Sequence, residues 1–192
     1  MASSWPRYEP VVFTTAIDVS PEDIDTLNRA RLPRRFLGGD MAVDAPVGVD
    51  VPGRGYLIRF TAGRGGGFYF SPSTGEVLYI DDRPEFGSNL VNSTLEQFTN
   101  TVKALIEAFP YYADFGVDPN EVDVDTLVDM YEASAARLAA LIGEIDPAAL
   151  TPETFWDDFL VAVVHGNYST ESILGDHDPE TGRRINVDKR GA

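Results

Sequence analysis

The chain has 192 residues, a net charge of −16 and no cysteine. This charge argues against a nucleic-acid or anionic-membrane ligand, because binding to either needs clustered Lys and Arg. The lack of cysteine excludes disulfides, thiolate zinc sites and cysteine nucleophiles. With 43% hydrophobic residues the chain can bury a core of its own. The composition predicts one domain over residues 1–174 and a polar tail at 175–192.

The first elements are marked by capping and turn residues. Ser20-Pro21-Glu22-Asp23 supplies an N-cap, a first-turn proline and two acids, which predicts a helix to about Ala30, ended by Leu32-Pro33. Residues 11–13 favour a short strand, and residues 37–55 a loop with one or two weak strands. The N-terminus lacks the pattern of a signal peptide, and no apolar run is long enough to span a bilayer. These features predict a cytoplasmic protein.

Three short runs of aromatic and aliphatic residues predict strands at residues 56–60, 68–70 and 77–80. The turn chemistry at 71–75 joins the last two into a hairpin. Polar residues after Ile80 predict that strand pairing stops there. Sequential strands of this kind form a mainly antiparallel meander, so with the helices that follow the predicted fold class is α+β.

The segment after the hairpin predicts an amphipathic helix from Leu95 to Phe109. Ser93 and Glu96 are spaced as a capping box, in which each side chain accepts from the backbone amide of the other. Phe98 begins the apolar face. This interpretation assigns Asn92, Ser93 and Glu96 to the backbone chemistry of the helix start.

Two further helices are predicted downstream. One spans about residues 121–142, and the last begins at Thr151-Pro152-Glu153 and runs to Val164. The predicted inner face of the first is Val124, Leu127, Val128, Tyr131, Ala135, Leu138 and Ile142.

None of the motifs that carry catalysis or metal binding is convincing. The glycines at 63–67 precede a strand rather than a helix, so they predict a hairpin turn and not a phosphate loop. Asp123-Val124-Asp125 and Asp176–Glu180 resemble parts of metal sites but are better explained as solvated surface. His165 and His177 have neither metal-binding spacing nor an evident nucleophile. The sequence predicts no catalytic residue, no metal and no cofactor.

Charge is concentrated in residues 107–158, which hold thirteen acids against one base, a net −12. This concentration, with aromatic residues just upstream, predicts a surface that binds a basic protein partner. The alternative is that the acids only confer solubility and the aromatic residues are core. The predicted partner-binding residues are Tyr111, Tyr112, Asp114, Phe115, Glu121, Asp125, Asp129 and Glu132.

Several of these residues and motifs resemble a known family. Leu32-Pro33 with Phe36, the aromatic hairpin, Thr74-Gly75-Glu76-Val77 and above all Leu90–Phe98 resemble the SUKH superfamily of bacterial immunity proteins, in the subgroup common in actinomycetes. The resemblance implies helices packed on a mainly antiparallel sheet. It also implies a non-catalytic protein that neutralises a polymorphic or contact-dependent toxin, often a nuclease or deaminase.

Other functions remain open at this point. Eukaryotic members of the same superfamily act as signalling adaptors, which makes a regulatory scaffold the main alternative. An acidic mimic of DNA that blocks a nucleic-acid enzyme is a second binding function. An enzyme ranks third, and a deep pocket with convergent polar side chains would favour it.

Overall fold

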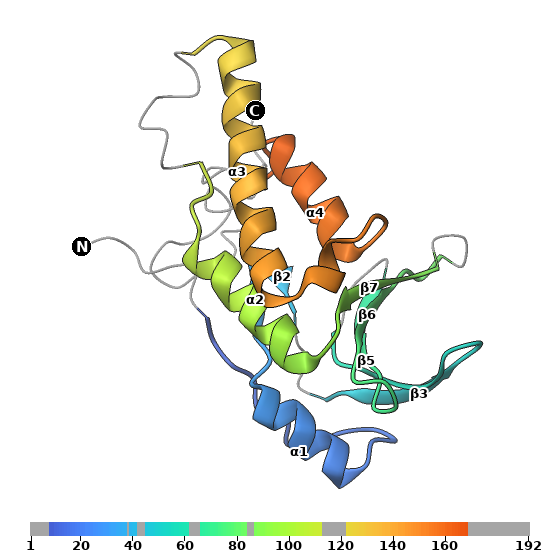
Figure 1. Cartoon of the computed structure of the whole chain (residues 1–192). Helices are drawn as coiled ribbons and strands as arrows, with labels where there is room; N and C mark the ends of the chain where they lie inside the picture. Colours follow the sequence, from blue (N-terminus) through green and yellow to red (C-terminus); the bar gives the residue numbers. More distant parts are fainter. Residues whose placement is uncertain are drawn as a thin grey trace, which may run out of the picture.

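The computed structural model describes residues 8–37, 39–41, 45–61, 66–83, 87–112 and 122–168. The predicted tail at 175–192, the acidic stretch 176–180 and most of the glycine-rich turn lie outside these ranges. Figure 1 shows a curved sheet on one side of the molecule and the longer helices on the other.

The sheet is a five-stranded antiparallel meander in which every strand pairs with its neighbours in the chain. A separate two-stranded pair precedes it. These findings confirm the predicted α+β class. The strands are β1 (Arg35–Phe36) and β2 (Gly39–Asp40) in the small pair, and β3 (Val47–Val51), β4 (Gly55–Arg59), β5 (Gly67–Phe70), β6 (Val77–Ile80) and β7 (Ser88–Asn92) in the meander.

Strand β7 corrects the expectation that pairing stops after Ile80. Its register places Leu90 opposite Leu78 and Asn89 opposite Tyr79. Polar residues are tolerated here because β7 is an edge strand, where side chains and one row of backbone groups can face water. The alternation of apolar and polar residues that marks a half-buried strand is therefore weak in residues 88–92.

Residues 11–13 form no strand, although the side chains of Val11 and Phe13 pack in the core. The Val11 amide donates to the Leu32 carbonyl at 2.9 Å. The backbone of Phe13 both donates to and accepts from the Asn28 side chain, at 2.8 and 3.1 Å. Val11 and Phe13 are buried. Val11 and Phe13 are therefore apolar because this segment packs against the first helix, and not because it pairs in a sheet.

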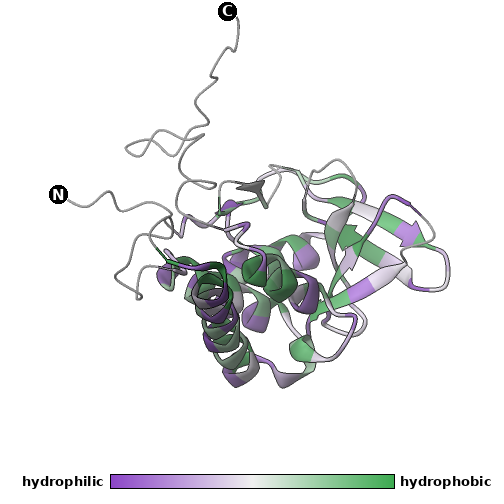
Figure 2. Cartoon of the chain, turned by 90° about the horizontal axis from the view of Figure 1, so that it is seen from above, coloured by the Kyte–Doolittle hydropathy of each residue, from purple (hydrophilic) through white to green (hydrophobic). Residues whose placement is uncertain are grey.

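The helices are α1 (Pro21–Ala30), α2 (Leu95–Glu107), α3 (Val124–Ile145) and α4 (Phe155–Val164), with a 3-10 turn η3 (Pro147–Leu150) between the last two. Ser20 caps α1 as predicted, accepting from the Asp23 amide at 3.1 Å. Helix α4 begins at Phe155, later than predicted, because residues 151–154 form a turn. In Figure 2 the helices carry hydrophilic and hydrophobic residues together, so each has a side for water and a side for the core.

The core lies between the sheet and the helices. Phe98 of α2 packs against Phe60 and Phe68, with ring centroids 5.8 and 5.6 Å apart, and Phe155 of α4 packs against Phe68 at 4.9 Å. Helix α3 contacts α2 and α4. A smaller apolar cluster of Leu57, Tyr69 and Leu78 lies apart from this core. Every residue of β5 is buried, so this strand joins the two clusters.

Candidate functional site

The N-terminal end of α3 carries the acids that were predicted to meet a partner. Asp123 is the N-cap, and its carboxylate accepts from the Thr126 amide and hydroxyl, both at 2.9 Å. These hydrogen bonds lower the pKa of Asp123. The Asp123–Asp125 pair is therefore explained by helix capping, and no group of three or more His, Asp or Glu side chains within the described residues is arranged to hold a metal ion.

The buried side of α3 agrees with the prediction at Ala135, Leu138 and Ile142 but not in the first turns. Met130 and Ser134 are buried in addition, whereas Val124 is 74% exposed and Val128 is 43% exposed. Figure 1 shows the reason, because the first turns of α3 extend past the end of α4. The prediction that both valines face the core was wrong for this end of the helix.

This overhang brings apolar and acidic groups to one exposed surface. Asp125, Asp129 and Glu132 are exposed, on the same turns as the two exposed valines. We call this surface the acidic end of α3, defined as Val124, Asp125, Val128, Asp129 and Glu132. Apolar side chains flanked by like charges are typical of a protein interface with an oppositely charged partner. Three other predicted contact residues, Asp114, Phe115 and Glu121, lie outside the described residues.

Tyr111 is part of the core and not of a surface. Its side chain is 0% exposed and packs edge-on against Phe109 and Phe159. Its backbone carbonyl accepts from Ser134 Oγ and Arg137 Nη2, both at 2.9 Å. Burial raises the pKa of Tyr111 far above its usual value. The prediction that Tyr111 touches a partner was wrong for the folded chain.

Tyr112 is half-buried and also has a structural role. Its hydroxyl donates to the Val163 carbonyl of α4 at 2.7 Å, and its ring lies 4.7 Å from that of Tyr131 on α3. Burial raises its pKa to about 12. Tyr111 and Tyr112 thus connect the segment after α2 to both later helices. The alternative that these aromatic residues are core holds for Tyr111 and for most of Tyr112.

The two tyrosines give a matched prediction. The Tyr111 hydroxyl is buried without a hydrogen-bond partner among the described residues. Tyr111→Phe is therefore expected to leave the unfolding free energy unchanged or raise it by up to about 1 kcal/mol, whereas Tyr112→Phe loses a hydrogen bond and about 1 kcal/mol. Urea unfolding of both variants checks this, and a larger loss in Tyr111→Phe than in Tyr112→Phe would contradict it.

The Asn92–Ser93 motif has a different role from the predicted capping box. Thr94 is the N-cap of α2, and its hydroxyl accepts from the Gln97 amide at 3.1 Å. Ser93 lies one residue too early to cap, and the exposed Glu96 does not close a box with it. Both parts of that prediction were wrong, whereas Phe98 does face the core.

Asn92 and Ser93 instead bind a buried carboxylate from the end of α3. Asp146 is 1% exposed. Its Oδ2 accepts from Asn92 Nδ2 at 3.1 Å and from the Ser93 amide at 2.7 Å, and its Oδ1 accepts from Ser93 Oγ at 3.0 Å. The Asn92 amide also donates to Thr101 Oγ1 at 3.3 Å, and Trp156 Nε1 donates to Asn92 Oδ1 at 3.1 Å. We call these five residues the Asp146 cluster.

The Asp146 cluster joins four parts of the fold. It connects the end of β7, the start of α2, the end of α3 and the start of α4. The carboxylate also lies beside the N-terminus of α2, where the helix dipole favours a negative charge. The sequence gives no sign of this pairing, since Asp146 is more than fifty positions from Asn92. The cluster fixes where α3 and α4 lie on the sheet.

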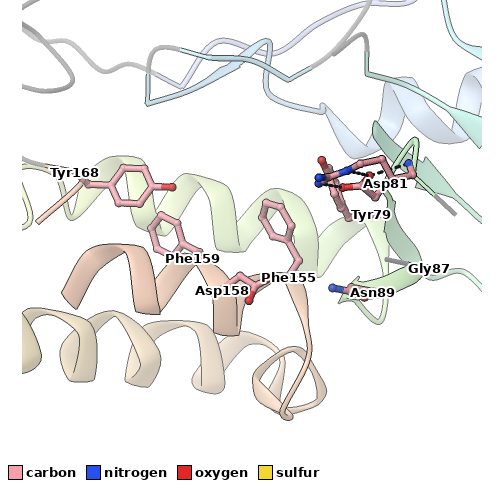
Figure 3. A pocket seen from close by; sticks show the side chains of 9 residues that line it. Tyr79, Asp81, Gly87, Asn89, Phe155, Asp158, Phe159 and Tyr168 are labelled. Atoms are coloured by element: carbon pink, nitrogen blue, oxygen red, sulfur yellow. Dashed lines mark hydrogen bonds and ion pairs between the residues drawn. The ribbon is translucent and has the colours of Figure 1, made fainter. Parts of the chain in front are cut away.

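A cleft of about 370 Å³ separates α4 from the ends of β6 and β7. Figure 3 shows aromatic side chains of α4 on one side and polar groups of the strands on the other. Arg83 donates to both carboxylate oxygens of Asp81, at 2.9 and 3.1 Å, and these hydrogen bonds lower the pKa of Asp81. The lining residues are Tyr79, Asp81, Arg83, Gly87, Asn89, Phe155, Asp158, Phe159 and Tyr168.

A model of the SUKH-4 immunity protein family matches residues 6–162 of the chain. The match covers well over half of the 192 residues, so the chain belongs to the SUKH-4 immunity protein family. No curated protein and no solved structure matched the chain. Family membership indicates a toxin-neutralising immunity role with a protein toxin as the partner, and such proteins generally act by binding rather than by catalysis. Across the described residues, no helix combines the length and apolar character needed to cross a membrane.

Proposed function

We propose that this protein neutralises a cognate toxin domain of nuclease or deaminase type by binding it in the cytoplasm through the acidic end of α3. The observation that carries the proposal is the exposure of Val124 and Val128 beside Asp125, Asp129 and Glu132. A domain that acts on nucleic acid needs a basic surface to hold phosphates. That surface is complementary in charge to this end of α3.

The two kinds of side chain have different tasks in the proposed complex. The acids speed association with a basic surface and disfavour acidic partners, while the valines supply apolar area that is removed from water on binding. Neutralisation then follows from covering the nucleic-acid-binding surface of the toxin. No catalytic step by the immunity protein is required.

Two alternatives of the binding class remain. An adaptor without a toxin would bind a housekeeping complex, and its gene would have no toxin gene beside it. A DNA mimic would need acids spaced like phosphates over a continuous face. The exposed valines beside the acids favour a mixed protein interface over such a mimic.

Charge reversal tests the proposed surface. The triple variant Asp125→Lys, Asp129→Lys and Glu132→Lys is expected to weaken binding to the toxin domain encoded beside the gene by at least about a hundredfold, because attraction becomes repulsion at three positions. Isothermal titration calorimetry of the purified pair gives the affinity, and survival of toxin-expressing cells gives the protection.

The matched control reverses three exposed acids elsewhere, in the variant Asp50→Lys, Glu107→Lys and Glu144→Lys. Glu107 and Glu144 lie in the last turns of α2 and α3, where Lys is favoured by the helix dipole. This variant has the same net charge as the test variant and should keep most of the affinity. Equal binding by test and control variants would remove the acidic end of α3 from the interface.

A further inference from the structure

A second hollow lies between the end of α1 and the first three turns of α2. Its volume is about 690 Å³, larger than the cleft beside α4. We call it the α1–α2 groove. It is lined by Tyr8, Thr26, Arg29, Ala30, Arg31, Leu95, Glu96, Thr99, Asn100 and Lys103.

The charge of this groove is opposite to that of the chain. Arg29, Arg31 and Lys103 are exposed and face the single acid Glu96, a local net charge of +2 in a protein of −16. In Figure 1, α1 and the N-terminal end of α3 lie at opposite ends of the molecule. The groove is therefore separate from the acidic end of α3, and what it binds does not depend on the proposed toxin surface.

The backbone that carries Arg31 is held in an unusual conformation. Arg31 is the C-cap of α1 with φ 56° and ψ 48°, the left-handed region in which glycine is favoured. Its carbonyl accepts from the Tyr8 hydroxyl, and the neighbouring Ala30 carbonyl accepts from Thr99 Oγ1 at 3.0 Å. An arginine here is less favourable for the helix end than glycine would be. This cap and its contacts fix the backbone from which the exposed Arg31 side chain reaches the edge of the groove.

The other two cations are held at the rim. Arg29 donates from Nε to the Asp25 carbonyl at 3.3 Å and from Nη2 to Thr26 Oγ1 at 3.1 Å, so its guanidinium lies along α1. Lys103 lies 3.9 Å from Glu107, a long ion pair between exposed groups that is worth little. Thr99 Oγ1 is already used as a donor to the Ala30 carbonyl, whereas the exposed amide of Asn100 also lines the groove and can both donate to and accept from the backbone of a peptide.

We propose that the α1–α2 groove binds an acidic peptide segment of a protein partner. Charge complementarity favours an anionic ligand, since three cations face one carboxylate. A nucleic acid is disfavoured because the rest of the chain would repel a long polyanion, whereas a short peptide brings only a few charges near the groove. The ligand class is thus an extended segment with two or three Asp or Glu residues.

The test uses the full chain and a fluorescein-labelled peptide of about twelve alternating Glu and Ser residues, followed by fluorescence anisotropy. Binding is expected at about 0.05 M salt and should weaken several-fold at about 0.5 M, as exposed charge pairs are screened. Lys103→Glu should weaken binding about tenfold. Arg31→Gly should weaken it about threefold while keeping or raising the urea midpoint, because glycine suits the left-handed C-cap.

Arg54→Glu is the matched control, since Arg54 is an exposed arginine in the turn between β3 and β4. It makes the same change in net charge as Lys103→Glu and should leave peptide binding unchanged. Three results of the binding assay would overturn the proposal. The first is that the parent chain does not bind the peptide. The second is that Arg54→Glu and Lys103→Glu weaken peptide binding equally, and the third is that a single-stranded oligonucleotide of equal charge binds more tightly than the peptide. Dimerisation in sedimentation that Lys103→Glu abolishes would also overturn it, by making the groove a contact between copies.

Discussion

Asp146→Ala is expected to lower the unfolding free energy by about 3 to 4 kcal/mol. The substitution removes the acceptor of three hydrogen bonds, from Asn92 Nδ2, the Ser93 amide and Ser93 Oγ. Asn92 is fully buried, so its amide cannot turn to water for a replacement. Urea unfolding followed by far-UV circular dichroism measures the loss.

Two further variants, one conservative and one at the surface, serve as comparisons for the stability loss in Asp146→Ala. Asp146→Asn keeps the shape and one oxygen, so it should cost about 1 to 2 kcal/mol, less than alanine. Asp129→Ala removes an exposed carboxylate of α3 and should change stability by no more than about 0.5 kcal/mol. If Asp146→Ala unfolds at the same urea concentration as Asp129→Ala, the Asp146 cluster does not hold these segments together.

Trp156→Ala is expected to have an effect as large, a loss of about 4 kcal/mol. Trp156 is 0% exposed, and its ring lies 5.0 Å from Phe155, 5.5 Å from Phe159 and 6.1 Å from Phe36. Alanine leaves a cavity among these rings and takes the donor from Asn92 Oδ1. Guanidinium unfolding gives the free energy, and the loss should be greatest for this substitution in α4.

Trp156→Phe separates the hydrogen bond from the packing. Phenylalanine keeps most of the aromatic contact but has no N–H, so this variant should lose about 2 kcal/mol. Combined with Asn92→Ala, it should lose less than the sum of the two single effects by about 1 kcal/mol, since both break the same bond. Strict additivity would mean that the indole acts through packing alone.

An element of the fold could be predicted where the residues that determine it are neighbours in the sequence. Ser20 next to Pro21 gives the start of α1, and the short apolar runs at residues 68–70 and 77–80 with a turn between them give the hairpin. Strand β7 could not be found in this way, because Ser88 and Asn89 are polar and the strand depends on pairing with β6. The exposure of the first turns of α3 has a similar cause. Val124 and Val128 fit the helical period, but α4 does not reach far enough to cover them.

The candidate site was predicted only in part. The exposure of Asp125, Asp129 and Glu132 follows from amphipathic spacing, which any surface helix shows. The burial of Tyr111 depends on Phe109, Phe159 and Ser134, which no local rule brings together. Asp146 is the clearest case. Among the acids of residues 107–158 that the structure describes, Asp146 alone is buried, and nothing in the sequence distinguishes it from those in water.

The overhang of α3 separates the residues that stabilise this protein from those of the proposed contact surface. Val124, Asp125, Val128 and Asp129 precede the first buried residue of the helix, Met130, and contribute little to the core. Substitutions on such turns usually change stability by less than about 0.5 kcal/mol. Descendants of this chain can therefore alter the shape and charge of this end of α3 while the Asp146 cluster keeps the fold. In the proposed complex with a toxin, the contact surface is thus free to diverge quickly on an unchanged scaffold.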